Sequence, residues 1–125
     1  MQTYHSEDAP AAIGPYSQAV RSGNLLFCSG QTPLDPETMT LVGEAIEEQT
    51  AQALENLSAI LAAAGLSLDD VVKTSVFLQT MDDFLGMNTT YERIFGDHKP
   101  ARTTVAVKQN PLGARVEIDC IAAFE

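Results

Sequence analysis

The sequence predicts an α+β domain in which two helices pack on one face of a mixed β-sheet. Two segments, residues 44–64 and 82–96, carry apolar side chains at the helical period of about 3.6 residues. Three others, residues 17–29, 71–79 and 103–124, are rich in β-branched and small apolar residues. The order is therefore hairpin, helix, strand, helix, hairpin. No helix remains to cover the second face of the sheet, so we expect an oligomer.

The first hairpin joins Ser17–Ser22 to Leu25–Ser29 through the two-residue turn Gly23-Asn24. The next segment, Gly30–Pro36, holds two prolines and a glycine. Because these residues interrupt regular structure, the segment is predicted to be a loop.

The first helix is predicted over Glu44–Ala64, with Gly65 at the position that usually ends a helix. Its apolar residues fall on one stripe that should face the sheet. They are Ile46, Ala53, Leu54, Leu57, Ile60, Leu61 and Ala64. The β-branched and aromatic run Val71–Gln79 then predicts a buried strand.

Asp82 or Asp83 is predicted to cap a second helix that runs to Gly96. Its inward stripe is Phe84, Met87 or Asn88, Tyr91 and Phe95. Asn88 is the polar member of this stripe. Its amide either ties down a neighbouring backbone or points into a pocket.

The last two strands, Thr103–Lys108 and Ala114–Phe124, are predicted to form a hairpin across the turn Asn110–Gly113. With the turn closed by its end residues, the strands would share one apolar face, since side chains alternate along a strand. In that register Val105 opposes Ile118 and Val107 opposes Val116, beside Cys120, Ala122 and Phe124. A one-residue shift would exchange the two faces.

The other face of this hairpin would gather charged and polar side chains from both strands. It carries Arg102, Thr104, Ala106, Glu117, Asp119 and Ile121. One interpretation is a solvated surface with an ion pair worth about 0–1 kcal/mol. We favour a site, because Ala106, Ile121 and Ala123 indicate a half-buried face and a guanidinium binds a carboxylate through two parallel bonds. Arg102 would then bind a small acid beside a water held by Glu117.

Composition narrows the class of protein. The 125 residues suffice for one domain, residues 1–125, and carry 17 acidic against 7 basic side chains, a net charge of −10. The basic residues are scattered, and no run of basic residues with interleaved aromatic residues occurs. Binding to nucleic acid or to anionic membranes needs clustered Lys and Arg, so neither is expected.

The N-terminal residues are polar and acidic, unlike a signal peptide, and no stretch approaches the roughly 18 apolar residues of a membrane span. We therefore expect a cytoplasmic protein. Cys28 and Cys120 lie in apolar strand patterns without metal-ligand spacing, which predicts buried free thiols and no metal. His5 and His98 have no evident partner and are predicted to be surface residues.

Several motifs, spread over nearly the whole chain in order, resemble the RidA/YjgF family. They are Ala9-Pro-Ala-Ala-Ile-Gly-Pro-Tyr-Ser-Gln-Ala19, Phe27-Cys-Ser-Gly-Gln-Thr-Pro-Leu-Asp-Pro36, Asn56-Leu57, Val72-Lys-Thr-Ser-Val-Phe77, Asn88-Thr-Thr-Tyr91, Pro100-Ala-Arg-Thr103 and Val116-Glu-Ile-Asp119. The resemblance implies a chorismate-mutase-like subunit and a homotrimer with its helices outside and its sites between subunits. It also implies hydrolysis of reactive enamines and imines, such as 2-aminoacrylate and 2-iminobutanoate, to 2-keto acids and ammonia, without a cofactor.

The resemblance also assigns roles to single residues. Arg102 would bind the substrate carboxylate and Glu117 would orient the attacking water. Tyr16, Gly30 and Asn88 match further substrate-binding positions of the family. Thr104 stands where many members have cysteine, which excludes a thiol role there, and Asn110 precedes Pro111 where some have leucine.

Two other functions remain open at this point. The same pocket could bind a 2-keto acid without turnover, as a regulatory protein would, although a pure carboxylate sensor would not need Glu117. A ribonuclease, an activity also attached to the family, would need paired acid–base groups near a basic groove. His5, His98 and the net charge argue against it.

Overall fold

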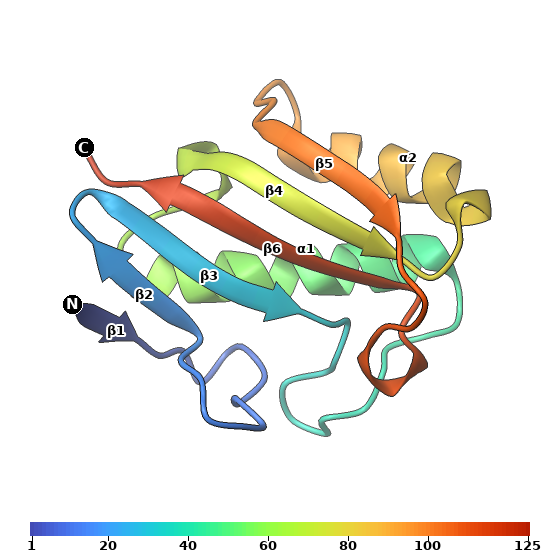
Figure 1. Ribbon diagram of the computed structural model, residues 1–125, viewed down its shortest axis with the longest axis horizontal. Coiled ribbons are helices and arrows are strands. Elements are labelled where there is room, and N and C mark those ends of the chain that lie inside the picture. Colours follow the sequence, from blue (N-terminus) through green and yellow to red (C-terminus); the bar gives the residue numbers. More distant parts are fainter.

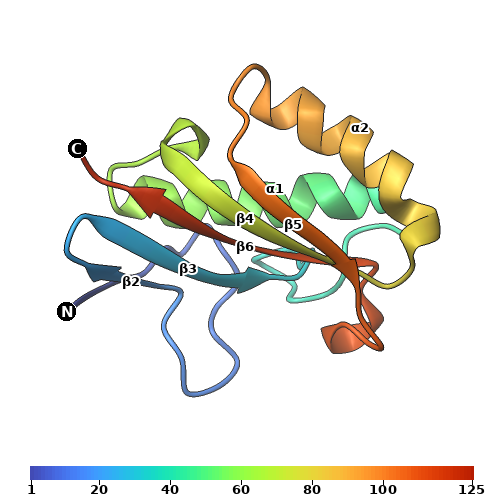
Figure 2. The ribbon, with the colours of Figure 1, turned by 45° about the horizontal axis from the view of Figure 1, so that its top comes forward.

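The computed structural model describes residues 1–125 and shows one six-stranded mixed sheet with two helices on the same face, as the sequence predicts (Figure 1). The strand order in the sheet is β1-β2-β3-β6-β4-β5. Figure 2 shows α1 behind the sheet and α2 next to it, above the edge strand β5. In chain order the elements are β1 (Gln2–Tyr4), β2 (Ala19–Ser22), β3 (Leu25–Gln31), α1 (Ile46–Ala63), β4 (Val71–Leu78), α2 (Phe84–Phe95), β5 (Ala101–Ala106) and β6 (Val116–Ala123).

The N-terminal hairpin is confirmed: β2 and β3 pair antiparallel, and Gly23 in the turn has a φ of 61°. Glycine suits this turn because that backbone conformation strains other residues. Strand β1, which pairs antiparallel with β2, was not predicted. Strand β3 also runs on to Gln31, so Gly30 belongs to a strand and not to the predicted loop.

Helix α1 is confirmed, and its apolar stripe belongs to the core between helix and sheet. Leu54, Leu57, Ile60 and Leu61 are fully buried. Gly65 follows the helix with a φ of 77°, the left-handed conformation typical of a residue just past a helix end.

Helix α2 begins where predicted, with Asp83 at its N-cap position, but the Asp83 carboxylate makes no capping hydrogen bond. A 3₁₀ turn, Met81–Asp83, precedes it, and the Thr80 hydroxyl accepts the Asp82 N–H at 3.2 Å. The Asp83 carboxylate instead forms an ion pair with Arg115, whose Nη1 lies 3.2 Å from Asp83 Oδ2. This ion pair engages the carboxylate that was expected to cap the helix.

The predicted C-terminal hairpin is wrong. Strand β4 lies between β5 and β6, parallel to β5 and antiparallel to β6. The 3₁₀ turn Pro111–Gly113 forms, but the chain on either side of it passes along the end of β4. The Val107 N–H donates to Leu78 O at 2.9 Å and the Gln79 N–H donates to Arg115 O at 2.9 Å. Strand β4 is therefore held between the two segments that were expected to pair.

The predicted faces of these strands are also wrong in part. Val116, Ile118, Cys120 and Ala122 are buried under the helices, as expected, so Glu117, Asp119 and Ile121 lie on the open face. In strand β5 the two faces are exchanged relative to the prediction. Val105 is 42% exposed, whereas Arg102 and Thr104 point to the side of α2. Arg102 and Glu117 thus lie on opposite faces of the sheet.

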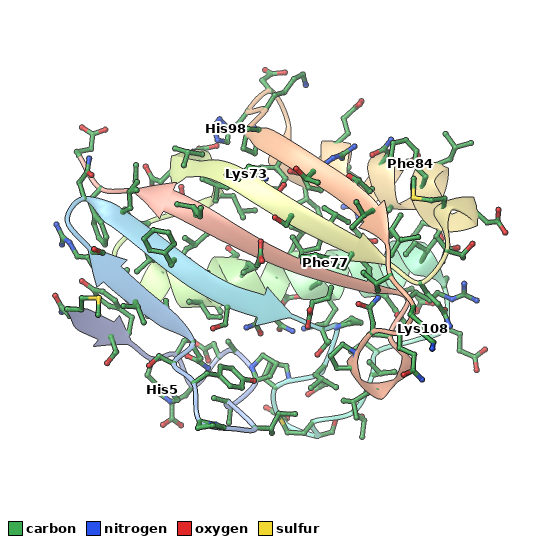
Figure 3. The ribbon with its side chains drawn as sticks, viewed as in Figure 1. His5, Lys73, Phe77, Phe84, His98 and Lys108 are labelled. Atoms are coloured by element: carbon green, nitrogen blue, oxygen red, sulfur yellow. The ribbon has the colours of Figure 1, made fainter.

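The core fills the space between the sheet and the helices. Cys28 and Cys120 belong to it as free, buried thiols and are direct partners in the β3–β6 ladder, which confirms the prediction for both. The other face is open and partly apolar; Figure 3 labels Lys73 and Phe77 of β4 on it. No helix of the chain combines the length and the apolar character that crossing a membrane requires.

Candidate active site

The predicted site residues fall into two separate groups, one on each face of the sheet. Arg102, Asn88 and Thr104 lie between β5 and α2, and we call them the arginine half. Glu117, Gly30 and Tyr16 lie around the end of β3, and we call them the glutamate half.

The arginine half is built around a cation without an anionic partner. The guanidinium carbon of Arg102 lies 4.8 Å from the centroid of the Tyr91 ring and 5.7 Å from that of Phe84. Its Nη1 is 4.0 Å from Met87 Sδ. None of the 17 Asp and Glu residues forms an ion pair with it. Arg102 is therefore half-buried against α2, with N–H donors left over for an acidic ligand.

Two polar atoms beside it are also unpaired. Asn88 Oδ1 and Thr104 Oγ1 are buried and have no hydrogen-bond partner. Buried polar atoms without a partner are uncommon. These two lie on the same side of the sheet as the unpaired guanidinium, so a polar ligand there could bond to them as well as to Arg102. Asn88 therefore does not tie down a neighbouring backbone through this oxygen, which favours the pocket interpretation.

A hollow of about 310 Å³ adjoins the arginine half at the C-terminal end of α2. Asn88, Tyr91, His98 and Arg102 are among its lining residues. His98 is not the free surface residue that was predicted: it is half-buried, and its Nε2 lies 2.7 Å from Val71 O. Because a carbonyl only accepts, this nitrogen carries a proton. Figure 3 shows His98 at the loop that leads into β5.

The glutamate half surrounds a second hollow of about 490 Å³ on the other face. Its lining residues are Ile13, Tyr16, Ser29, Gly30, Thr32, Pro111, Leu112 and Glu117. Glu117 lies flat against β3, where a Cβ on Gly30 would come within 3.0 Å of its Cδ. The backbone conformation at Gly30 is one that any residue can adopt. A side chain at this position, however, would enter the space that the Glu117 carboxyl occupies. Ile13 and Leu112 form the apolar side of this hollow. The sequence did not predict their role, because both lie in irregular segments without a periodic pattern.

The pKa of the Glu117 carboxyl is raised above its ordinary value, first by burial and then by the charge of Asp119 two residues along the same face. A raised pKa brings a carboxyl closer to neutral pH, where it exchanges protons most effectively. The Tyr16 hydroxyl, in contrast, is exposed and accepts the Ile13 N–H at 3.3 Å.

The arrangement suits the handling of a small acid and a water, if both halves act on the same molecule. The arginine half supplies a cation and two unpaired polar atoms, and the glutamate half supplies a carboxyl with a raised pKa. No group of three or more His, Cys, Asp or Glu side chains is placed to hold a metal ion.

Comparison with known proteins identifies the family. The family model described as Endoribonuclease L-PSP matches residues 6–124. A RutC family protein of Pyrococcus horikoshii is 51% identical over 120 residues, which cover 96% of this chain and 95% of that protein. The 2-iminobutanoate/2-iminopropanoate deaminase of Salmonella typhimurium is 46% identical over 124 residues, which cover 97% and 96%.

Solved structures agree. A structure from Thermotoga maritima superposes with a TM-score of 0.96 at 54% identity and covers 100% of this chain and 98% of that one. The crystal structure of E. coli TdcF with bound serine has a TM-score of 0.95 at 37% identity and covers 100% of both chains. This chain therefore belongs to the Endoribonuclease L-PSP family, the RidA/YjgF/RutC family that its motifs resemble.

Proposed function

We propose that this protein is a deaminase that hydrolyses 2-iminobutanoate and 2-iminopropanoate, the imine of 2-aminoacrylate, to 2-keto acids and ammonia. The observation that carries the proposal is Arg102: a half-buried guanidinium with no carboxylate partner, next to unpaired Asn88 Oδ1 and Thr104 Oγ1. A substrate with a carboxylate and an imine nitrogen meets these needs. The name of the Salmonella relative and the serine bound to E. coli TdcF support it.

In the proposed mechanism, Arg102 binds the substrate carboxylate through two parallel N–H bonds. Asn88 Oδ1 accepts an N–H from the imine nitrogen, and the Thr104 hydroxyl bonds to the substrate or to a water beside it. These contacts fix the C=N bond in one orientation, and orientation alone lowers the barrier to attack.

Glu117 then supplies the proton transfers. As a carboxylate it accepts a proton from water while the water oxygen attacks the C=N carbon. Glu117 passes that proton to the nitrogen, which gives a neutral carbinolamine. It then carries the hydroxyl proton to the nitrogen as the C–N bond breaks, so ammonia leaves, the 2-keto acid remains and one water is consumed for each imine. With an enamine substrate, the protonated form of Glu117, which its raised pKa favours, first delivers a proton to carbon.

This mechanism requires the two halves to meet across a subunit boundary, because they lie on opposite faces of one chain. We propose a homotrimer whose open sheet faces meet and whose sites lie between subunits. Its support is the uncovered apolar surface of that face: Phe27 is 44% and Val105 is 42% exposed. Apolar patches of this kind mark protein interfaces.

The family description names an endoribonuclease, but the residues of this chain favour a deaminase. His5 is exposed, and its Nε2 lies 3.9 Å from Glu7 Oε1. His98 is bonded to a backbone carbonyl instead of a second acid or base. A net charge of −10 further disfavours a polyanionic substrate.

The experiment is a coupled assay in which the protein is added to a threonine dehydratase reaction and 2-ketobutyrate release is followed. The proposal predicts faster release without an added cofactor. Equal rates with and without the protein would contradict it, and 2-ketobutyrate binding without acceleration would favour the binding protein instead. Light scattering tests the assembly separately: a 13.4 kDa monomer at micromolar concentration contradicts the trimer.

A further inference from the structure

Beneath the guanidinium of Arg102, a buried hydrogen bond joins α2 to β4. The Tyr91 hydroxyl and Thr74 Oγ1 are 2.8 Å apart, and each is bonded only to the other. Thr74 is fully buried and Tyr91 is 8% exposed. Of the residues that β4 turns toward the helices, Val71, Thr74, Val76 and Leu78, only Thr74 is polar.

The strand register brings this bond to Arg102. Thr74 and Arg102 are direct partners in the parallel β4–β5 ladder, so their side chains leave the sheet on the same face and at the same level. The Tyr91 ring lies across them, 4.8 Å from the guanidinium carbon. One residue on each of three elements thus forms a stack of threonine, tyrosine and arginine.

The bond fixes the ring more firmly than packing alone. Threonine is β-branched and has few rotamers, so its hydroxyl holds the phenol at one place. Burial raises the pKa of the Tyr91 phenol, while the Thr74 bond and the Arg102 charge lower it, and the net shift is upward. The hydroxyl therefore stays protonated at neutral pH and can keep the bond.

Burying two hydroxyls where a phenylalanine and a valine would fit brings little net stability. A role in orienting the ring accounts for the pair better than a role in holding the fold together. A guanidinium stacked on an aromatic face keeps its N–H edge free and directed, which two-point binding of a carboxylate requires.

We propose that Thr74 and Tyr91 are positioning residues that hold the guanidinium of Arg102 in the orientation for binding a carboxylate. Their hydroxyls are bonded to each other, so both act through Arg102 and not through a hydrogen bond of their own to the substrate. The inference rests on the proposed function only in naming a 2-keto or 2-imino acid as the ligand.

The test is calorimetry of 2-ketobutyrate with Tyr91→Phe, Thr74→Val and the double variant, alongside their kinetics. Each single change should weaken binding roughly 2- to 10-fold, the range of one hydrogen bond. The KM for the imine should rise by the same factor while kcat stays near that of the wild type. The double variant should be no worse than either single one, since all three lose the same bond. Thr74→Ser keeps the hydroxyl and should restore affinity.

Matched controls remove the same atoms elsewhere. Tyr4→Phe acts on a ring that packs against Phe124, and Thr50→Val removes a buried hydroxyl that has no partner. Both should bind 2-ketobutyrate like the wild type. If Tyr91→Phe and Thr74→Val only lower the melting temperature and leave affinity unchanged, the bond is structural and the proposal is wrong. Losses that multiply in the double variant would also overturn it, because the hydroxyls would then act independently.

One measurement separates this proposal from the deaminase proposal. If the wild-type protein neither accelerates 2-ketobutyrate release nor binds the keto acid, the deaminase proposal fails. The NMR relaxation of the Arg102 Nε–H group still tests the pair without any ligand. We expect a more mobile guanidinium in Tyr91→Phe than in the wild type; equal mobility would contradict the positioning role.

Discussion

Arg102 and Glu117 lie on opposite faces of the sheet, on strands that are separated by β4. Arg102 leans on the rings of α2, whereas Glu117 lies against Gly30 on the open face. Under the proposed function, one chain carries two half-sites, each with part of the chemistry that imine hydrolysis needs. The proposed deaminase requires neighbouring subunits to join them.

Arg102→Ala should abolish most deaminase activity and leave the fold intact. Loss of a desolvated partner for the substrate carboxylate costs about 2–5 kcal/mol, or roughly 30-fold to several thousand-fold in kcat/KM. Arg102→Lys should keep only part of the wild-type activity, because an ammonium lacks the planar pair of N–H donors that a guanidinium offers to a carboxylate. The matched control is Arg93→Ala, an exposed arginine on the same helix that Arg102 packs against. Turnover of Arg102→Ala at the wild-type rate would rule out the carboxylate contact.

Glu117→Gln should keep 2-keto acid binding and lose turnover, because an amide preserves the shape but cannot accept a proton. Calorimetry of 2-ketobutyrate beside the steady-state rate checks both parts. If affinity and rate fall together, Glu117 supports the site structurally and does not act as the base.

Asp119→Asn should move the acidic limb of kcat/KM to lower pH. The pKa of Glu117 is raised first by burial and then by Asp119, so the ionised base is lost at a higher pH than for an ordinary glutamate. Removal of the Asp119 charge lowers that pKa, while the effect of burial remains. Asp69→Asn, an exposed site outside both halves, is the control. A limb that stays in place or moves to higher pH contradicts this account.

Gly30→Ala should reduce turnover with little loss of stability. The new methyl would lie 3.0 Å from Glu117 Cδ and 3.2 Å from its Oε1, so the carboxyl must shift. The backbone at Gly30 does not adopt the left-handed conformation, so alanine is not strained there. The kcat and the melting temperature together check the prediction; unchanged kcat would show that the position of Glu117 against β3 is unimportant.

Local patterns predicted the elements well, but not the pairing of the last strands. The stripe of α1 and the Gly23 turn are local signals, and both hold in the structure. The neighbour of β6 depends instead on distant contacts, such as those from Val107 to Leu78 and from Gln79 to Arg115. A signal was present, since a strand, a helix and a strand over residues 71–106 favour a parallel crossover pair, which β4 and β5 form.

The candidate residues were predicted better than their arrangement. The antiparallel hairpin placed Arg102 and Glu117 on one face, and the insertion of β4 removed that relationship. Asn88 was recognised as an inward polar residue, and its unpaired oxygen fits a pocket. The contact of Tyr91 with Arg102 was missed, although a tyrosine in a buried stripe implies a partner for its hydroxyl.

The claim that the site is shared between subunits is tested most directly by mixing two inactive variants. Arg102→Ala subunits keep an intact glutamate half, and Glu117→Gln subunits keep an intact arginine half. After unfolding and refolding together in equal amounts, random trimers should regain about a quarter of the wild-type activity, because each site draws its two halves from different subunits. Each variant refolded alone should stay inactive. A mixture no more active than the separate variants would contradict a site built between subunits.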